Sequence, residues 1–185
     1  MANTLIVPGL KNSGPAHWQS LWQLKRPDYV RVVQRDWSEP RLDEWAAPID
    51  RAIRKGRGKA LIVAHSYGCL AALRRLEERS DDVAGVMLVA PADPERWGQT
   101  PFSARLAVPS VLAASRNDPW LEFDKAKSLA ASLGAAFVDL GMAGHVNAES
   151  GYGPWEQGER ILDELRAQAV RSEQVERQLA LAAAL

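Results

Sequence analysis

The sequence contains few of the residues that mark an exported or membrane-bound protein. Among its 185 residues there is one cysteine, Cys69, so no disulfide can form within the chain. The chain passes from Met1 directly into the apolar stretch Leu5-Ile6-Val7, without the charged region and apolar core of a signal peptide. No apolar stretch approaches the length of a membrane span. We therefore expect a cytoplasmic protein that does not enter the membrane.

An excess of charge of either sign is also missing. The 23 basic and 23 acidic side chains cancel, which leaves no electrostatic footprint for nucleic acid or for an anionic membrane. The length suffices for one domain with a buried core but is short for an enzyme with a separate lid domain. We expect one domain over residues 1–170, followed by an amphipathic or frayed helical tail over residues 171–185. The tail leaves homodimer formation open.

Apolar runs alternate with helical patterns along the chain. Most of the six runs are continuous and rich in β-branched residues, which is typical of parallel strands covered on both faces. They cover residues 5–7, 30–33, 60–64, 86–90, 108–113 and 136–140. Helical patterns cover residues 15–25, 42–54, 66–79, 121–133 and 155–169, the first with Pro15 at its first helical position. The alternation predicts an α/β fold: a six-stranded, mostly parallel sheet in the order 2-1-3-4-5-6 with helices on both faces.

The sharpest local motif is Ala64-His65-Ser66-Tyr67-Gly68, between the third strand and the next helix. It is a G-x-S-x-G nucleophile elbow with alanine in place of the first glycine. The residues two positions before and after the serine are small, because bulky side chains there would collide with the neighbouring strand and helix. The motif favours Ser66 as a nucleophile. The alternative is that Ser66 only caps the helix.

A serine nucleophile needs a base and an acid that orients the base. The chain has three histidines, and His145 lies in a glycine-rich loop after the sixth strand, where the hydrolase fold carries its base. His65 is more typical of a packing or hydrogen-bonded histidine, and His17 precedes the serine in the chain. Asp118 follows the fifth strand and lies between Ser66 and His145, as the order in this fold requires. Asp93, after the fourth strand, is the second candidate, and Asp118 could instead serve an Asn-Asp-Pro turn.

Hydrolysis also needs donors for the developing oxyanion. The backbone N–H of Tyr67, directly after the nucleophile, is the expected first donor. The second is expected from the loop after the first strand, where Gly9 permits the backbone angle that aims the N–H of Leu10. The alternative is that Pro8-Gly9 forms a simple turn.

The substrate is expected to be a small molecule. Residues 91–107, where larger hydrolases insert a lid, are only long enough for a loop with one short helical turn. Aromatic residues after the ends of strands could line the pocket, since ligands bind at the carboxyl ends of such strands. The candidates are Trp37, Trp97, Phe102 and Trp120. An aromatic rim favours small apolar acyl or aryl groups, although packing is the alternative role for these side chains.

Taken together, these motifs resemble the small α/β-hydrolases of the retinoblastoma-binding-protein-nine-like or YdeN-like family. The resemblance rests on four blocks: Val7-Pro8-Gly9 with His17-Trp18-Gln19, His65-Ser66-Tyr67-Gly68, Ser115-Arg116-Asn117-Asp118-Pro119, and Gly144-His145-Val146-Asn147 with Ser150-Gly151-Tyr152-Gly153-Pro154-Trp155. It implies a single-domain α/β-hydrolase without a lid domain and a triad of Ser66, Asp118 and His145. No retinoblastoma-type pocket is expected as a partner, because Tyr67 and Ala71 flank Cys69 where an L-x-C-x-E segment has leucine and glutamate.

The sequence therefore predicts an esterase-like serine hydrolase. It would act on a small carboxylic ester, thioester or activated amide through an acyl-enzyme, without metal or cofactor. Two alternatives stay open. One is a catalytically silent binding protein with the same fold, and the other is an acyltransferase or perhydrolase that uses the same triad.

Overall fold

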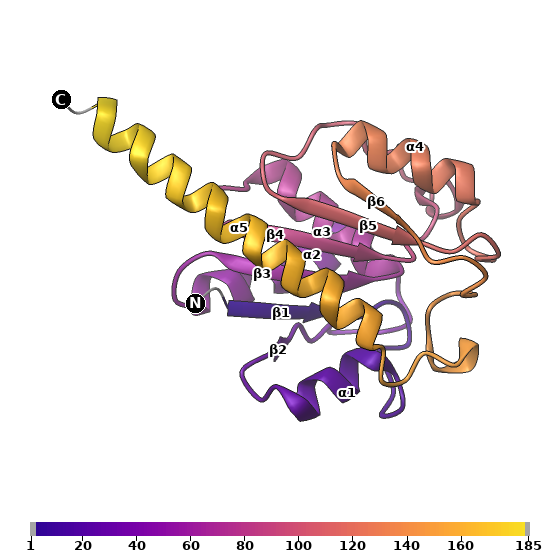
Figure 1. Ribbon diagram of the computed structural model, residues 1–185. Coiled ribbons are helices and arrows are strands. Elements are labelled where there is room, and N and C mark those ends of the chain that lie inside the picture. Colours follow the sequence, from indigo (N-terminus) through magenta and orange to yellow (C-terminus); the bar gives the residue numbers. More distant parts are fainter. Residues whose placement is uncertain (1–2, 184–185) are drawn as a thin grey trace.

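A six-stranded parallel sheet runs through the centre of the protein in the computed structural model, which describes residues 3–183 (Figure 1). Its strands are β1 (Asn3–Val7), β2 (Val30–Arg31), β3 (Ala60–His65), β4 (Val83–Val89), β5 (Ser110–Ala114) and β6 (Ala136–Asp139). Their spatial order is β2-β1-β3-β4-β5-β6, and every neighbouring pair is parallel. The predicted strand order and fold class are confirmed.

Helices cover both faces of the sheet. The helices are α1 (Trp18–Lys25), α2 (Leu42–Lys55), α3 (Tyr67–Glu78), α4 (Phe123–Leu133) and α5 (Glu156–Ala183), with 3₁₀ turns η1 (Pro94–Trp97) and η2 (Ala148–Ser150). Buried side chains of α2, α3 and α4 share one core cluster, and those of α1 and α5 share the other. Successive strand residues alternate between the two clusters, Ile62 and Ala64 on one side and Leu61 and Val63 on the other. This double burial explains why the strand sequences are continuous apolar runs.

The start of α1 differs from the prediction. The helix begins at Trp18, and Pro15 lies in the preceding turn. His17 is the residue that caps the helix, since its Nδ1 accepts a hydrogen bond from the N–H of Gln19. A proline has the correct φ for a first helical position but cannot compete with a side chain that satisfies a free terminal amide.

Helix α5 passes without a break through the predicted boundary at residue 170. Its buried side chains end at Ala169, Glu176 still pairs with Lys59 at 3.0 Å, and the last turns of the helix project from the body of the protein (Figure 1). The projecting part exposes Val175, Leu179 and Leu181. Among residues 3–183, no helix combines the length and the hydropathy needed to cross a membrane.

Candidate active site

The turn between β3 and α3 holds Ser66 in a strained backbone conformation. Its φ of 56° and ψ of −126° are rare for a residue with a side chain and cost about 1–3 kcal/mol. Hydrogen bonds fix the peptide groups on both sides, because Ser66 N–H donates to the Val89 carbonyl and the Ser66 carbonyl accepts from Ala92 N–H. Strand β4 and the segment after it therefore hold the serine in place.

Two glycines permit this turn to pack against the loop after β1. A Cβ on Gly68 would lie 2.6 Å from the Val7 carbonyl oxygen and 2.5 Å from that of Pro8. A Cβ on Gly9 would lie 2.7 Å from the Cβ of Ser66. Neither distance is compatible with a side chain, so the backbone of this loop can lie directly against the nucleophile elbow only because both residues are glycine.

A continuous hydrogen-bonded chain joins Ser66, His145 and Asp118. The hydroxyl of Ser66 lies 2.8 Å from Nε2 of His145, and Nδ1 of His145 lies 3.0 Å from both carboxylate oxygens of Asp118. The side chains of His145 and Asp118 are only 9% and 3% exposed. The arrangement requires the proton on Nδ1, which leaves Nε2 free to accept from the serine.

The sequence left open that Ser66 only caps a helix and that Asp118 only forms a turn, and the structure answers the two questions differently. The hydroxyl of Ser66 makes no capping bond to α3, so it is directed to the imidazole and not to its own helix. Asp118 does form the turn suggested by its sequence, accepting from Trp120 N–H at 2.9 Å, while it also binds His145. Asp93, the second acid candidate, binds Lys125 at 2.9 Å and caps η1.

The other two histidines are packed in a row beside His145. Ring centroids lie 4.8 Å apart for His17 and His65, and 4.9 Å apart for His65 and His145. Burial, with a contribution from nearby Arg31, lowers the pKa of His17 to about 4. Burial also lowers the pKa of His65 well below its ordinary value. Both are therefore neutral at pH 7, and His65 bonds through Nε2 to the His145 carbonyl.

Side chains from the loop after β5 hold the loop that carries His145. The hydroxyl of Ser115 accepts from Ala143 N–H at 2.9 Å, and Oδ1 of Asn117 accepts from Gly144 N–H at 2.8 Å. The segment that carries Asp118 therefore also holds the loop of His145. The sequence analysis assigned no role to Ser115 and Asn117. Their place in the motif Ser115-Arg116-Asn117-Asp118-Pro119, which carries the family resemblance, was the one sign of their importance.

The expected oxyanion donors are free to bind a ligand. Among residues 3–183, the N–H groups of Leu10 and Tyr67 have no protein acceptor. The next amide, that of Lys11, donates to the Trp37 carbonyl at 2.8 Å and so fixes the loop. Since Gly9 lies against Ser66, the amide of Leu10 follows directly beside the nucleophile. The assignment of these two groups as the oxyanion hole stays a prediction.

Comparison with known proteins identifies the family. Residues 4–164 match the family described as serine hydrolases. The chain belongs to the serine hydrolase family. A YdeN-like hydrolase from Pectobacterium atrosepticum has 38% sequence identity and a TM-score of 0.85, with 91% of each chain covered.

More distant relatives share the fold. YdeN of Bacillus subtilis, described as a hydrolase, is 28% identical over 80% of this chain and 87% of its own length. Its crystal structure has a TM-score of 0.77 at 23% identity and covers 90% of this chain and 100% of that one. A monoacylglycerol lipase of Paleococcus ferrophilus has a TM-score of 0.69 at 16% identity, covering 89% and 94%. The resemblance to YdeN-like hydrolases is confirmed, and the protein is a hydrolase with an α/β-hydrolase fold.

Three of the four aromatic residues expected to line the pocket of this serine hydrolase are partly exposed. Trp120 is 44% exposed, with its ring centroid 6.2 Å from that of His145. Trp97 packs edge-on against Tyr67 at 5.4 Å, and Trp37 packs against Trp45 at 5.8 Å. Their contact with substrate stays a prediction.

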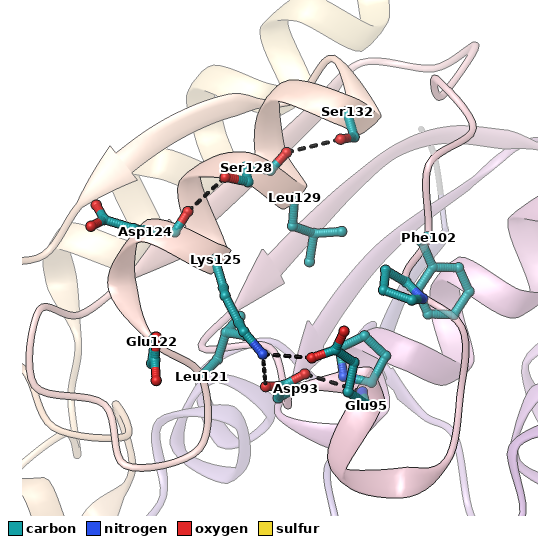
Figure 2. A pocket seen from close by; sticks show the side chains of 12 residues that line it. Asp93, Glu95, Phe102, Leu121, Glu122, Asp124, Lys125, Ser128, Leu129 and Ser132 are labelled. Carbon is teal, nitrogen blue, oxygen red and sulfur yellow. Dashed lines mark hydrogen bonds and ion pairs between the residues drawn. The ribbon is translucent and has the colours of Figure 1, made fainter.

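Phe102, the fourth of these aromatic residues, lines a hollow that is distinct from the candidate active site. It is buried and lines a hollow of about 360 Å³ between the η1 segment and α4 (Figure 2). Lys125 lies in this hollow and binds Asp93 and Glu95 (Figure 2). Among the residues described, the walls of the hollow include no member of the Ser66–His145–Asp118 chain. The hollow is therefore separate from the candidate active site.

Cys69 is not suited to act as a nucleophile beside Ser66. Cys69 is buried, with its Sγ 3.5 Å from the Val89 carbonyl oxygen, and burial raises the pKa of its thiol. A buried thiol with a raised pKa is a packing residue and not a nucleophile. Within residues 3–183, no group of three or more histidine, cysteine, aspartate and glutamate side chains is arranged to hold a metal ion.

Proposed function

We propose that the protein hydrolyses small carboxylic esters, thioesters or activated amides through an acyl-enzyme on Ser66. The observation that carries the proposal is the unbroken hydrogen-bonded chain from Ser66 through His145 to Asp118. The serine has a base at 2.8 Å, and the base has a carboxylate that fixes its tautomer. These are the three elements that convert a weak hydroxyl nucleophile into a reactive one.

The reaction follows from the positions of these groups. Nε2 of His145 takes the hydroxyl proton as Ser66 Oγ attacks the acyl carbonyl carbon, while Asp118 stabilises the imidazolium. The N–H groups of Tyr67 and Leu10 bind the oxyanion. His145 returns the proton to the leaving group, and the acyl-enzyme remains. A water molecule then gives its proton to His145 and attacks the acyl carbon, and that proton passes to Ser66 as the acid departs.

The proposed size and polarity of the substrate rest on the surroundings of the triad. The segment over residues 91–107 contains only the 3₁₀ turn η1 and forms no lid domain. The partly exposed rings of Trp37, Trp97 and Trp120 offer apolar surface for a short acyl or aryl group. We therefore expect turnover of p-nitrophenyl esters to fall as the acyl chain lengthens.

The experiment combines a fluorophosphonate probe with p-nitrophenyl acetate. In the wild-type protein we expect Ser66 to be labelled and the ester to be hydrolysed. Ser66→Ala is expected to lose labelling and to reduce kcat by more than about 10⁴-fold, since it removes the nucleophile. Ser128→Ala is the matched control, because Ser128 lies on the exposed side of helix α4 and its hydroxyl donates only to the Asp124 carbonyl. A folded wild-type protein whose Ser66 remains unlabelled would contradict the proposal.

A further inference from the structure

The loop that carries His145 is held by two buried ring donors on consecutive carbonyl groups. Nε2 of His65 lies 2.9 Å from the carbonyl oxygen of His145. Nε1–H of Trp18 donates to the carbonyl oxygen of Val146, also at 2.9 Å. One donor ends strand β3 and the other begins helix α1, so two elements far away in the chain converge on this loop.

Neither donor can exchange its partner for water. His65 and Trp18 are both buried, and each ring is packed on other rings. Trp18 lies edge-on to Trp22 at 4.7 Å and to Trp155 at 5.2 Å, while His65 lies edge-on to His17. In such a dry site, removal of the donor leaves an unsatisfied carbonyl and not a hydrated one.

The protonation state of His65 suits it to this role. Burial, with the neighbouring imidazoles of His17 and His145, lowers its pKa well below the ordinary value. The neutral ring carries one proton, and a bond to a carbonyl oxygen places that proton on Nε2. His65 therefore acts as a donor toward the loop of His145 and adds no charge beside the base.

The backbone at the second carbonyl needs such support. Val146 has a φ of 48°, in the left-handed region that a β-branched residue rarely adopts. Trp18 holds the peptide that follows Val146, through its carbonyl. The peptide before Val146 is held by His65 at the His145 carbonyl and by the turn bond from Val146 N–H to the Ala143 carbonyl. Without the clamp the loop could relax to negative φ, and the imidazole of His145 would rotate away from Ser66.

We infer that His65 and Trp18 are positioning residues for catalysis, forming a two-carbonyl clamp that holds His145 on Ser66. This inference rests on the proposed function for its kinetic consequence. The clamp acts on the backbone of the base, so it affects the geometry of proton transfer and not the space for substrate. Its loss should therefore lower kcat and leave KM unchanged.

The kinetic test removes each hydrogen-bond donor and leaves an apolar side chain in its place. With p-nitrophenyl acetate, Trp18→Phe and His65→Leu are each expected to lower kcat by about tenfold or more, because small displacements of catalytic groups reduce rates steeply. His65→Gln, whose amide nitrogen reaches close to the position of Nε2, is expected to restore most of that loss. Trp22→Phe is the matched control: Trp22 is buried in the same ring cluster, but its Nε1 has no partner among residues 3–183.

A second measurement is independent of turnover. The Nδ1 proton between His145 and Asp118 should give a low-field ¹H NMR signal in the wild type, identified by its absence in His145→Ala. We expect Trp18→Phe to shift or broaden this signal and Trp22→Phe to preserve it. If the wild type shows the signal but neither hydrolysis nor probe labelling, the proposed function fails while the NMR comparison still tests the clamp.

The clamp is overturned if folded Trp18→Phe keeps both the wild-type kcat and the wild-type signal. It is also overturned if Trp22→Phe lowers kcat as much as Trp18→Phe does, since ring packing would then explain the effect. Circular dichroism and urea unfolding establish that each variant is folded. If His65→Leu does not fold, the pair Trp18→Phe and Trp22→Phe decides the question alone.

Discussion

Gly9 shows how much of the site depends on one missing side chain. A Cβ at this position would lie 2.7 Å from the Cβ of Ser66 and 3.2 Å from its Oγ. These contacts are with Ser66, the proposed nucleophile, so an added methyl group must displace either the serine or the loop that carries the Leu10 amide. On the proposed mechanism, Gly9 would therefore affect the reaction as well as the turn.

We predict that Gly9→Ala reduces the kcat for p-nitrophenyl acetate by about 100-fold, the cost of displacing a catalytic group or an oxyanion donor. Gly14→Ala is the control in the same loop, because a Cβ there has no atom within 4 Å. Kinetics and urea unfolding of both variants provide the measurement. Equal loss of activity in the two variants would show that the loop responds to any substitution and not to contact with Ser66.

The sequence was enough to name the three candidate residues that the structure joins in one hydrogen-bonded chain, but not the residues that hold them. Ser66, Asp118 and His145 follow strand ends in the order that this fold requires, so a linear pattern brings them together. The hydrogen bond from Trp18 to Val146 joins residues 128 positions apart and leaves no local pattern. A histidine that caps a helix, as His17 does, also has no strong sequence signature, which is why α1 was expected to begin three residues early.

Among the elements, α3 is joined to its neighbours by one buried cation. The side chain of Arg75 is 2% exposed. It pairs with Asp50 of α2 at 2.9 Å and with Asp82, just before β4, at 2.7 Å. The pairing secures the far end of the helix that begins directly after Ser66.

Replacement of this cation should be costly. We predict that Arg75→Met lowers the free energy of unfolding by about 3 kcal/mol, because it removes the buried cation that Asp50 and Asp82 share and leaves them only the more exposed Arg54 and Arg79. Arg74→Met is the matched control on the same helix: its partner Asp43 is 80% exposed, so a loss below about 1 kcal/mol is expected. Urea unfolding measures both variants. A similar loss of unfolding free energy in the two variants would show that burial of Arg75 does not strengthen its ion pairs with Asp50 and Asp82.

The elements themselves were predictable where hydrophobic periodicity decides them. The six strands and five helices follow from apolar runs and helical spacing, because each face must be buried. Their ends depend on pairing and capping. Strand β2 is shorter than its apolar run because only Val30 and Arg31 pair with β1 in the ladder. Helix α5 continues to Ala183 although its last buried side chain is Ala169, so burial alone could not predict its end.

For the whole molecule, stability should depend on pH through the histidine row. The pKa of His17 is about 4 in the folded protein, against an ordinary value of 6.5. Between these values the unfolded chain binds a proton that the folded protein does not, so stability falls as the pH falls. His65 acts in the same direction, because burial also lowers its pKa.

We predict that His17 alone removes about 2 kcal/mol from the free energy of unfolding between pH 7 and pH 5. His17→Asn should reduce this dependence, since asparagine can cap α1 without titrating in this range. Urea unfolding of both proteins at the two pH values measures the difference. An unchanged pH dependence in the variant would contradict a neutral, buried His17.

Helix α5 extends from the body of the protein in a fixed direction relative to the candidate active site. The part beyond Glu176, the last residue that pairs with the body, extends about 10 Å at 1.5 Å per residue. It leaves the body on the side opposite the arrowheads of the strands, at whose carboxyl ends Ser66, Asp118 and His145 lie (Figure 1). A solid support or a fused protein attached to the end of α5 would thus be held away from the edge that carries Ser66, Asp118 and His145, and immobilised molecules would present that edge to the solution.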